Sequence, residues 1–152
     1  MRLTREKIKN VVPIESPMLC IDEICEIEYG KYVHGYRKIN ADEYWCSSHF
    51  VDRPIFPGTL IIETMAQISA FMFYREGITK TLKSYLGRVD NVKFLQNVVP
   101  NCKIYIEAWI IMNTDKLAKM QCVARLENQS KIVAKGEITL FFLNAINETN
   151  EK

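Results

Sequence analysis

A possible base, a possible carbonyl-binding residue and a possible acid lie within fifteen positions of one another: His49, Gly58 and Glu63. Histidine can take up a proton near neutral pH, and a carboxylic acid can release one. Gly58 comes just before an apolar run, where its backbone N–H and the first N–H groups of a helix could polarise a carbonyl oxygen. Each residue also has an ordinary interpretation: a structural histidine, a turn glycine, and a glutamate that is exposed or paired with an arginine such as Arg88. Together they indicate a base, an acid and a carbonyl-binding group beside an apolar wall, which would suit an acyl chain.

The segment around Glu63, residues 59–76, contains neither proline nor glycine and predicts a long helix ended by Gly77. This helix is apolar nearly all round, as in a core helix or a membrane span. It is too short for a span and contains Glu63, which favours the core helix. At about 100° per residue, one narrow face collects small and polar residues: Thr59, Glu63, Ala66, Gln67 and Ala70. Burying an ionised carboxylate among apolar neighbours is costly, and this favours the protonated form that a general acid needs.

Two residues near Glu63 are candidates for substrate contact. Gln67 lies one helical turn further on, where it could orient the carboxyl group or serve in helix packing. Phe56 could line an acyl tunnel or fill the core. Phe56 lies in the long irregular stretch 40–58, and long ordered loops in compact domains are often functional.

The remaining elements indicate an α+β fold with one long helix against one antiparallel sheet. A short helix is expected over Arg5–Val12, and six runs read as strands: Met18–Glu28, Tyr32–Ile39, Ser84–Val92, Lys103–Met112, Ala118–Glu127 and Ile132–Leu143. We expect a single domain over residues 1–143 and a polar tail over 144–152.

The composition excludes several classes of protein. Twenty basic and eighteen acidic residues leave a charge of +2 over 152 residues, which argues against broad binding to nucleic acid. Five cysteines show neither C-x-x-C pairs nor the spacing of a zinc site, and they are typical of reduced thiols in a cytoplasmic protein. The first ten residues lack the apolar run of a signal peptide.

The segment from His49 to Gln67 reads HFVDRPIFPGTLIIETMAQ. It resembles the active-site segment of the 3-hydroxyacyl-[acyl-carrier-protein] dehydratases of fatty-acid synthesis, with matching His-to-Gly and His-to-Glu spacings. Two further segments, Pro17–Asp22 and Val92–Pro100, are also similar to that family. The family's Pro-Gly pair is Val51–Asp52 here, and its His-Arg pair is Ile14–Glu15. These differences indicate a divergent member, which could serve a specialised acyl or polyketide pathway.

The resemblance implies a hotdog fold, in which a curved antiparallel sheet wraps around a long helix. It implies a homodimer or a trimer of dimers, with each site taking its histidine from one subunit and its glutamate from the other. His49 would remove the C2 proton, Gly58 would polarise the thioester carbonyl, and Glu63 would protonate the departing C3 hydroxyl. The substrate would arrive on the phosphopantetheine arm of acyl carrier protein. No metal or redox cofactor, nucleic acid or membrane would take part.

Two alternatives remain at this point. A hotdog acyl thioesterase would also use a helix carboxylate, although the His-to-Glu spacing and the Pro-Gly-x-Leu segment favour the dehydratase. A non-catalytic acyl-binding subunit would account for the altered loop, but it would not need His49, Gly58 and Glu63 together.

Overall fold

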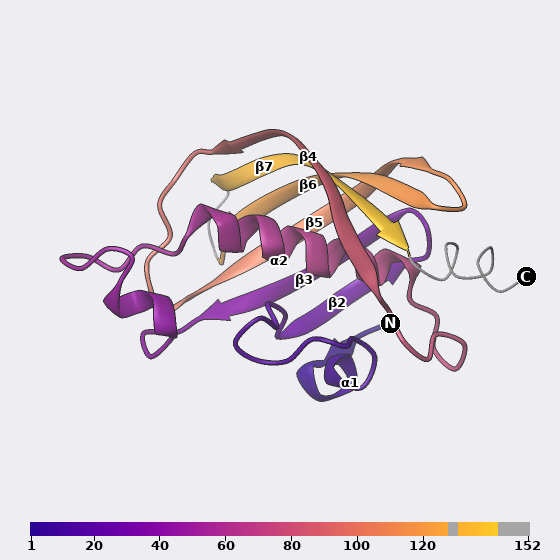
Figure 1. Cartoon of the computed structure of the whole chain (residues 1–152), viewed down its shortest axis with the longest axis horizontal. Helices are drawn as coiled ribbons and strands as arrows, with labels where there is room; N and C mark the ends of the chain where they lie inside the picture. The colour runs from indigo at the N-terminus through magenta and orange to yellow at the C-terminus, as the bar shows by residue number, and fades with distance from the viewer. Residues whose placement is uncertain (128–130, 143–152) are drawn as a thin grey trace, which may run out of the picture.

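A single sheet curves around helix α2 in the computed structural model, which describes residues 1–127 and 131–142 (Figure 1). Helix α2 spans Gly58–Ala70 and is followed by a 3₁₀ turn, Phe71–Phe73. The strands are β1 (Leu3–Thr4), β2 (Glu23–Glu28), β3 (Tyr32–Ile39), β4 (Ser84–Phe94), β5 (Cys102–Asn113), β6 (Leu117–Leu126) and β7 (Ile132–Phe142). A short helix α1 (Arg5–Lys9) and a 3₁₀ turn, Tyr44–Ser47, complete the elements of the described residues.

Within the described residues the seven strands follow the order β1-β2-β3-β5-β6-β7-β4, and every neighbouring pair is antiparallel. The sheet does not close, so β4 and β1 are its two edge strands. Strand β4 follows α2 in the chain. It pairs with β7 at the end of the sheet opposite β1 (Figure 1). This arrangement confirms the predicted α+β class and the hotdog fold.

Alternating burial explains why the sheet wraps the helix. The inward positions of β6 are Ala118, Met120, Cys122 and Ala124, all fully buried, and their neighbours in the strand are partly exposed. Three of these four side chains are small, so the helix can lie close to the sheet. Met65 and Ile68 of α2 are fully buried in the same core. The apolar helix is therefore a core helix, as its composition predicted.

The predicted boundaries differ from the structure at two places. Helix α2 ends at Ala70, earlier than predicted, because the turn between β2 and β3 meets its end: the Gly30 amide donates to the Met72 carbonyl at 3.0 Å. The strand predicted from Met18 begins only at Glu23, because the preceding backbone binds a side chain of α2 instead of a neighbouring strand. The predicted tail, residues 144–152, lies outside the described residues.

Candidate active site

Glu63 and Gln67 line a cavity of about 230 Å³ between α2, the chain before β2 and the start of β4. Four of the five residues predicted to share one helix face line it, whereas Thr59 is exposed and lies outside. The other walls are mostly apolar: Val12, Pro13, Ile14, Leu82, Lys83, Ser84, Tyr85, Leu86 and Leu140, together with Ala66 and Ala70 of the helix. A carboxyl group therefore opens into a space that suits an apolar chain.

Gln67 is held by three hydrogen bonds that fix the direction of its amide group. Its Nε2 donates to Glu63 Oε1 at 2.7 Å and to the Met18 carbonyl at 2.7 Å. Its Oε1 accepts from the Cys20 amide at 2.8 Å. Both partners in the 18–20 segment are backbone groups, so they hold the amide of Gln67 in one position. From this position Nε2 can orient the carboxyl group of Glu63. The alternative partner for Glu63, Arg88, instead donates to Asp90 at 2.8 Å.

Replacing Gln67 by leucine should lower kcat about 10- to 100-fold, because the carboxyl group of Glu63 loses the donor that aims it. A steady-state assay of the reaction that the resemblance implies measures this change. The matched control is Gln121→Leu, which removes a glutamine on the outward face of β6 that donates to the Gly136 carbonyl. An unchanged kcat in Gln67→Leu would show that Gln67 serves only in packing.

His49 follows the 3₁₀ turn Tyr44–Ser47, and its ring is fixed by two contacts. Nδ1 lies 2.7 Å from the Ile55 carbonyl, and the ring stacks on Phe50 with 4.3 Å between ring centroids. A carbonyl oxygen can only accept a hydrogen bond, so Nδ1 carries the proton and Nε2 is left as the basic nitrogen. The backbone supports this position, because the His49 amide donates to the Trp45 carbonyl at 2.8 Å.

His49 and Glu63 do not meet within one protomer. The cavity that holds Glu63 has no wall from His49, Phe56 or Gly58. Among the described residues, no hydrogen bond or ion pair joins the two side chains directly. Within one protomer, the two side chains therefore do not line a common cavity.

Gly58 is the first residue of α2, where the first N–H groups of a helix have no carbonyl partner within it. The Pro57 carbonyl accepts from the amides of Leu60 and Ile61, at 2.9 and 3.2 Å. A Cβ atom added at Gly58 would lie 3.0 Å from Cε1 of Phe94, so any larger residue would displace that ring. This close approach explains the glycine and leaves a backbone donor at the positive end of the helix.

Phe56 is buried in the core at 2% exposure and does not line the cavity. Its ring packs edge-on against Trp45, with centroids 5.2 Å apart, and the Arg37 guanidinium lies 4.8 Å from its centroid. These contacts describe a packing residue beneath the histidine loop. Its predicted contact with substrate stays a prediction.

Replacing Phe56 by alanine should lower the free energy of unfolding by about 3–5 kcal/mol, because a buried aromatic ring leaves a cavity. Urea denaturation measures this loss, with Phe50→Ala as the control, because Phe50 is 52% exposed. A raised KM with unchanged stability would instead assign Phe56 to the substrate tunnel.

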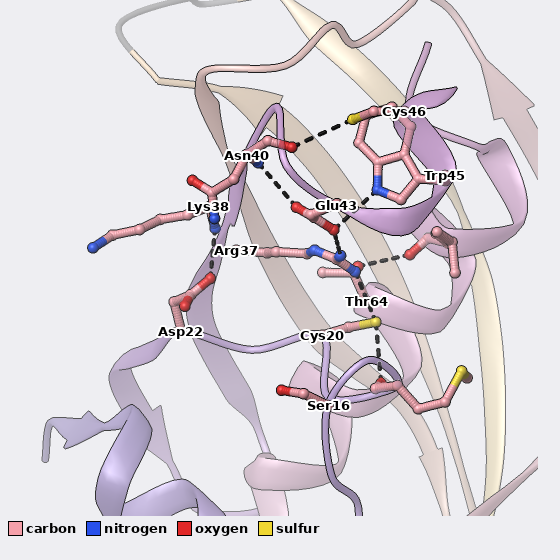
Figure 2. Close-up of polar contacts among 12 residues, drawn as sticks. Ser16, Cys20, Asp22, Arg37, Lys38, Asn40, Glu43, Trp45, Cys46 and Thr64 are labelled. Carbon is pink, nitrogen blue, oxygen red and sulfur yellow. Dashed lines mark hydrogen bonds and ion pairs between the residues drawn. The ribbon is translucent and has the colours of Figure 1, made fainter. Parts of the chain in front are cut away.

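A polar cluster that was not predicted from the sequence lies beside the site and contains Arg37, Glu43 and Cys20 (Figure 2). Arg37 is only 5% exposed and lies on the inward face of β3, between Gly35 and Ile39 in the alternating pattern. An arginine at an inward position of a strand was the signal that could have revealed it. Burial raises the pKa of the Cys20 thiol, which Arg37 opposes.

The described part of the chain lacks two features that would indicate another kind of protein. No group of three or more His, Cys, Asp or Glu side chains among these residues could hold a metal ion. No helix in residues 1–127 and 131–142 is long and apolar enough to cross a membrane.

Comparison with known proteins identifies the family. The model of the FabA-like domain matches residues 12–137. A 3-hydroxyacyl-[acyl-carrier-protein] dehydratase FabZ of Clostridium botulinum (strain Hall) is 38% identical over 134 residues, covering 87% of this chain and 90% of the relative. The chain belongs to the FabA-like family of 3-hydroxyacyl-[acyl-carrier-protein] dehydratases.

A second relative and a solved structure are also similar to this chain. The FabZ dehydratase of Bacillus subtilis is 29% identical over 137 residues, covering 90% of this chain and 96% of the relative. The dehydratase heterocomplex ApeI:P of Xenorhabdus doucetiae contains a chain with a TM-score of 0.70 and 13% identity, covering 95% of this chain and 97% of that one. At this identity the likeness shows a shared fold.

Proposed function

We propose that the chain catalyses the reversible dehydration of a (3R)-3-hydroxyacyl thioester on acyl carrier protein to the trans-2-enoyl thioester, in fatty-acid synthesis or a related acyl or polyketide pathway. The observation that carries this proposal is Glu63, which Gln67 orients into a mostly apolar cavity in a chain of the dehydratase family. The apolar walls suit the acyl tail, and the carboxyl group suits the acid that releases water.

Three groups divide the reaction between them. His49 Nε2 takes the C2 proton, and the electron pair of the broken C–H bond moves toward the thioester carbonyl. The Gly58 N–H stabilises the charge that develops on that oxygen. The electron pair then returns to form the C2–C3 double bond as the C3–O bond breaks, and Glu63 gives its proton to the departing hydroxyl, which leaves as water. Proton exchange with solvent returns His49 and Glu63 to their starting states, so the steps call for no further cofactor.

The exposed edge of β4 supports the homodimer that this chemistry requires. Strand β4 pairs only with β7 in the described part of the sheet, and it carries the exposed apolar residues Tyr85, Leu86, Val89 and Phe94. An unpaired edge of this length is usually covered. The start of β4 also forms a wall of the Glu63 cavity. A second chain on this edge would therefore lie beside the cavity, where its His49 could complete the site.

Exposed basic residues support acyl carrier protein as the partner, because carrier proteins are acidic. Arg53 lies in the loop that follows His49, and Lys93 adjoins Phe94, which covers Gly58; both basic side chains are exposed. Lys103 contributes less, because it pairs with Glu127 at 3.0 Å. The five free cysteines fit the cytoplasmic location that we propose for the reaction.

Mixing two inactive variants tests the proposal. His49→Ala and Glu63→Gln chains, each with its own tag, are unfolded, mixed and refolded together. A mixed dimer has one site with both defects and one with neither, so random pairing should restore about one quarter of wild-type turnover. Each variant refolded alone is the control. A mixture that stays inactive, although the purified mixed dimer is folded, would contradict the shared site.

A further inference from the structure

Arg37 lies at the centre of a hydrogen-bond network that includes Cys20, Glu43 and Trp45 (Figure 2). Further hydrogen bonds of Gln67 and of the His49 amide connect this network to both proposed catalytic groups of one protomer. Its guanidinium is a planar fork, and the two Nη atoms point to different segments of the chain. Nη1 donates to Cys20 Sγ at 2.8 Å, and Nη2 donates to Glu43 Oε2. At 5% exposure, this side chain is shielded from water that could replace either contact.

The first arm of the network runs from Arg37 to Glu63. Cys20 accepts from Arg37 and donates its thiol hydrogen to the Met18 carbonyl at 3.3 Å. These contacts fold the 18–20 segment so that the Met18 carbonyl and the Cys20 amide face Gln67. Gln67 in turn donates to Glu63. The position of the carboxyl group therefore depends on the contact between the thiol and the guanidinium.

The second arm runs from Arg37 to His49. Glu43 Oε2 accepts from both Arg37 and the indole Nε1 of Trp45, the latter at 2.9 Å. Its other oxygen accepts from the Asn40 amide at 2.9 Å, so the carboxylate holds the 3₁₀ turn in place. The Trp45 carbonyl then accepts from the His49 amide. Arg37 thus fixes the start of the histidine loop as well.

We propose that Arg37 is a positioning residue for both catalytic groups, and this inference rests on the proposed function. In a dimer whose sites are shared, the His49 and the Glu63 of one protomer belong to different sites. Arg37 of each protomer therefore supports the base of one site and the acid of the other. Neither Arg37 nor Cys20 lines the cavity, so their loss should lower kcat and leave KM unchanged.

The mixed dimer separates the two arms. Its intact site takes Glu63 from the His49→Ala chain, the acid donor, and His49 from the Glu63→Gln chain, the base donor. Cys20→Ala should lower kcat about 10-fold in the acid donor and have no effect in the base donor. Trp45→Phe should show the opposite dependence, because it cuts the arm to His49. Arg37→Met should lower kcat in either donor.

Conservative variants keep the test interpretable. Cys20→Ser retains a donor for the Met18 carbonyl and an acceptor for Arg37, so it should restore most of the kcat lost in Cys20→Ala. Arg37→Met leaves Glu43 without its cation and can unfold the chain. Arg37→Lys keeps the charge but lacks the fork, so it should also lower kcat in both donors. Arg2→Met is the control, because Arg2 pairs with Glu23 at the start of β2, outside the 18–20 segment, and it should leave kcat unchanged.

Two results would overturn this inference. Folded Arg37 variants that retain kcat in both donors, or a Cys20→Ala effect that is equal in both, would show that the network only stabilises the fold. These results leave the proposed function intact, because the parent mixed dimer is then active. An inactive parent mixed dimer would instead overturn the shared site, and the double role of Arg37 with it.

Discussion

Replacing His49 by alanine should lower kcat by about 1,000- to 10,000-fold, because the reaction loses the base that removes the C2 proton. The Ile55 carbonyl positions the imidazole through Nδ1, which leaves Nε2 as the basic nitrogen. The effect is measured as the rate at which an enoyl thioester on acyl carrier protein is hydrated. The loss of the enoyl absorbance reports this rate. The melting temperature should change little, since His49 is only partly buried.

The matched control for this prediction is His34→Ala. His34 lies on β3, where its ring packs against Tyr105 with 5.5 Å between centroids, and it does not line the Glu63 cavity. This variant should keep wild-type kcat. Comparable activity in wild type and His49→Ala would contradict the assignment of His49 as the base.

Replacing Glu63 by glutamine should lower kcat by about 100- to 10,000-fold, because the amide cannot give a proton to the departing hydroxyl. Glutamine has nearly the shape of glutamate and can still accept from Gln67, so the cavity and KM should change little. The same absorbance assay measures kcat, and circular dichroism checks the fold.

Glu107→Gln is the control for Glu63, since Glu107 accepts from Tyr32 on the sheet face at 3.2 Å. Its kcat should equal that of the wild type. A Glu63→Gln enzyme that retained turnover while Glu63→Ala lost it would show that Glu63 only binds substrate.

The part of the cavity wall that α2 contributes could be predicted from the sequence, because it depends on a local property, the helical period. Glu63, Ala66, Gln67 and Ala70 recur at the spacing of one helix face, and all four line the cavity. The antiparallel pairing of β5, β6 and β7 could be expected for a similar reason, because alternation recurs along these three consecutive strands. The pairing of β4 with β7 could not be expected in this way.

Contacts between distant segments could not be predicted in this way. Gln67 binds backbone groups of Met18 and Cys20, almost fifty residues away in the chain. Nearly every residue has these backbone groups, so the residue types do not indicate which of them Gln67 contacts. The same contact replaces the predicted start of β2. The packing of Phe56 against Trp45 depends equally on tertiary structure. In the site that we propose, His49 and Glu63 come from two chains, so the residues of one chain show only the two halves.

The most direct test of the central claim is the reaction of the wild-type protein with crotonyl thioester on acyl carrier protein. Loss of the enoyl absorbance, a mass gain of one water on the carrier, and free thiol are followed in the same sample. We predict that absorbance falls to an equilibrium value as the hydrated carrier accumulates, with no release of thiol. Release of thiol at the same rate as the loss of crotonyl groups would contradict the dehydratase and assign the site to thioester hydrolysis.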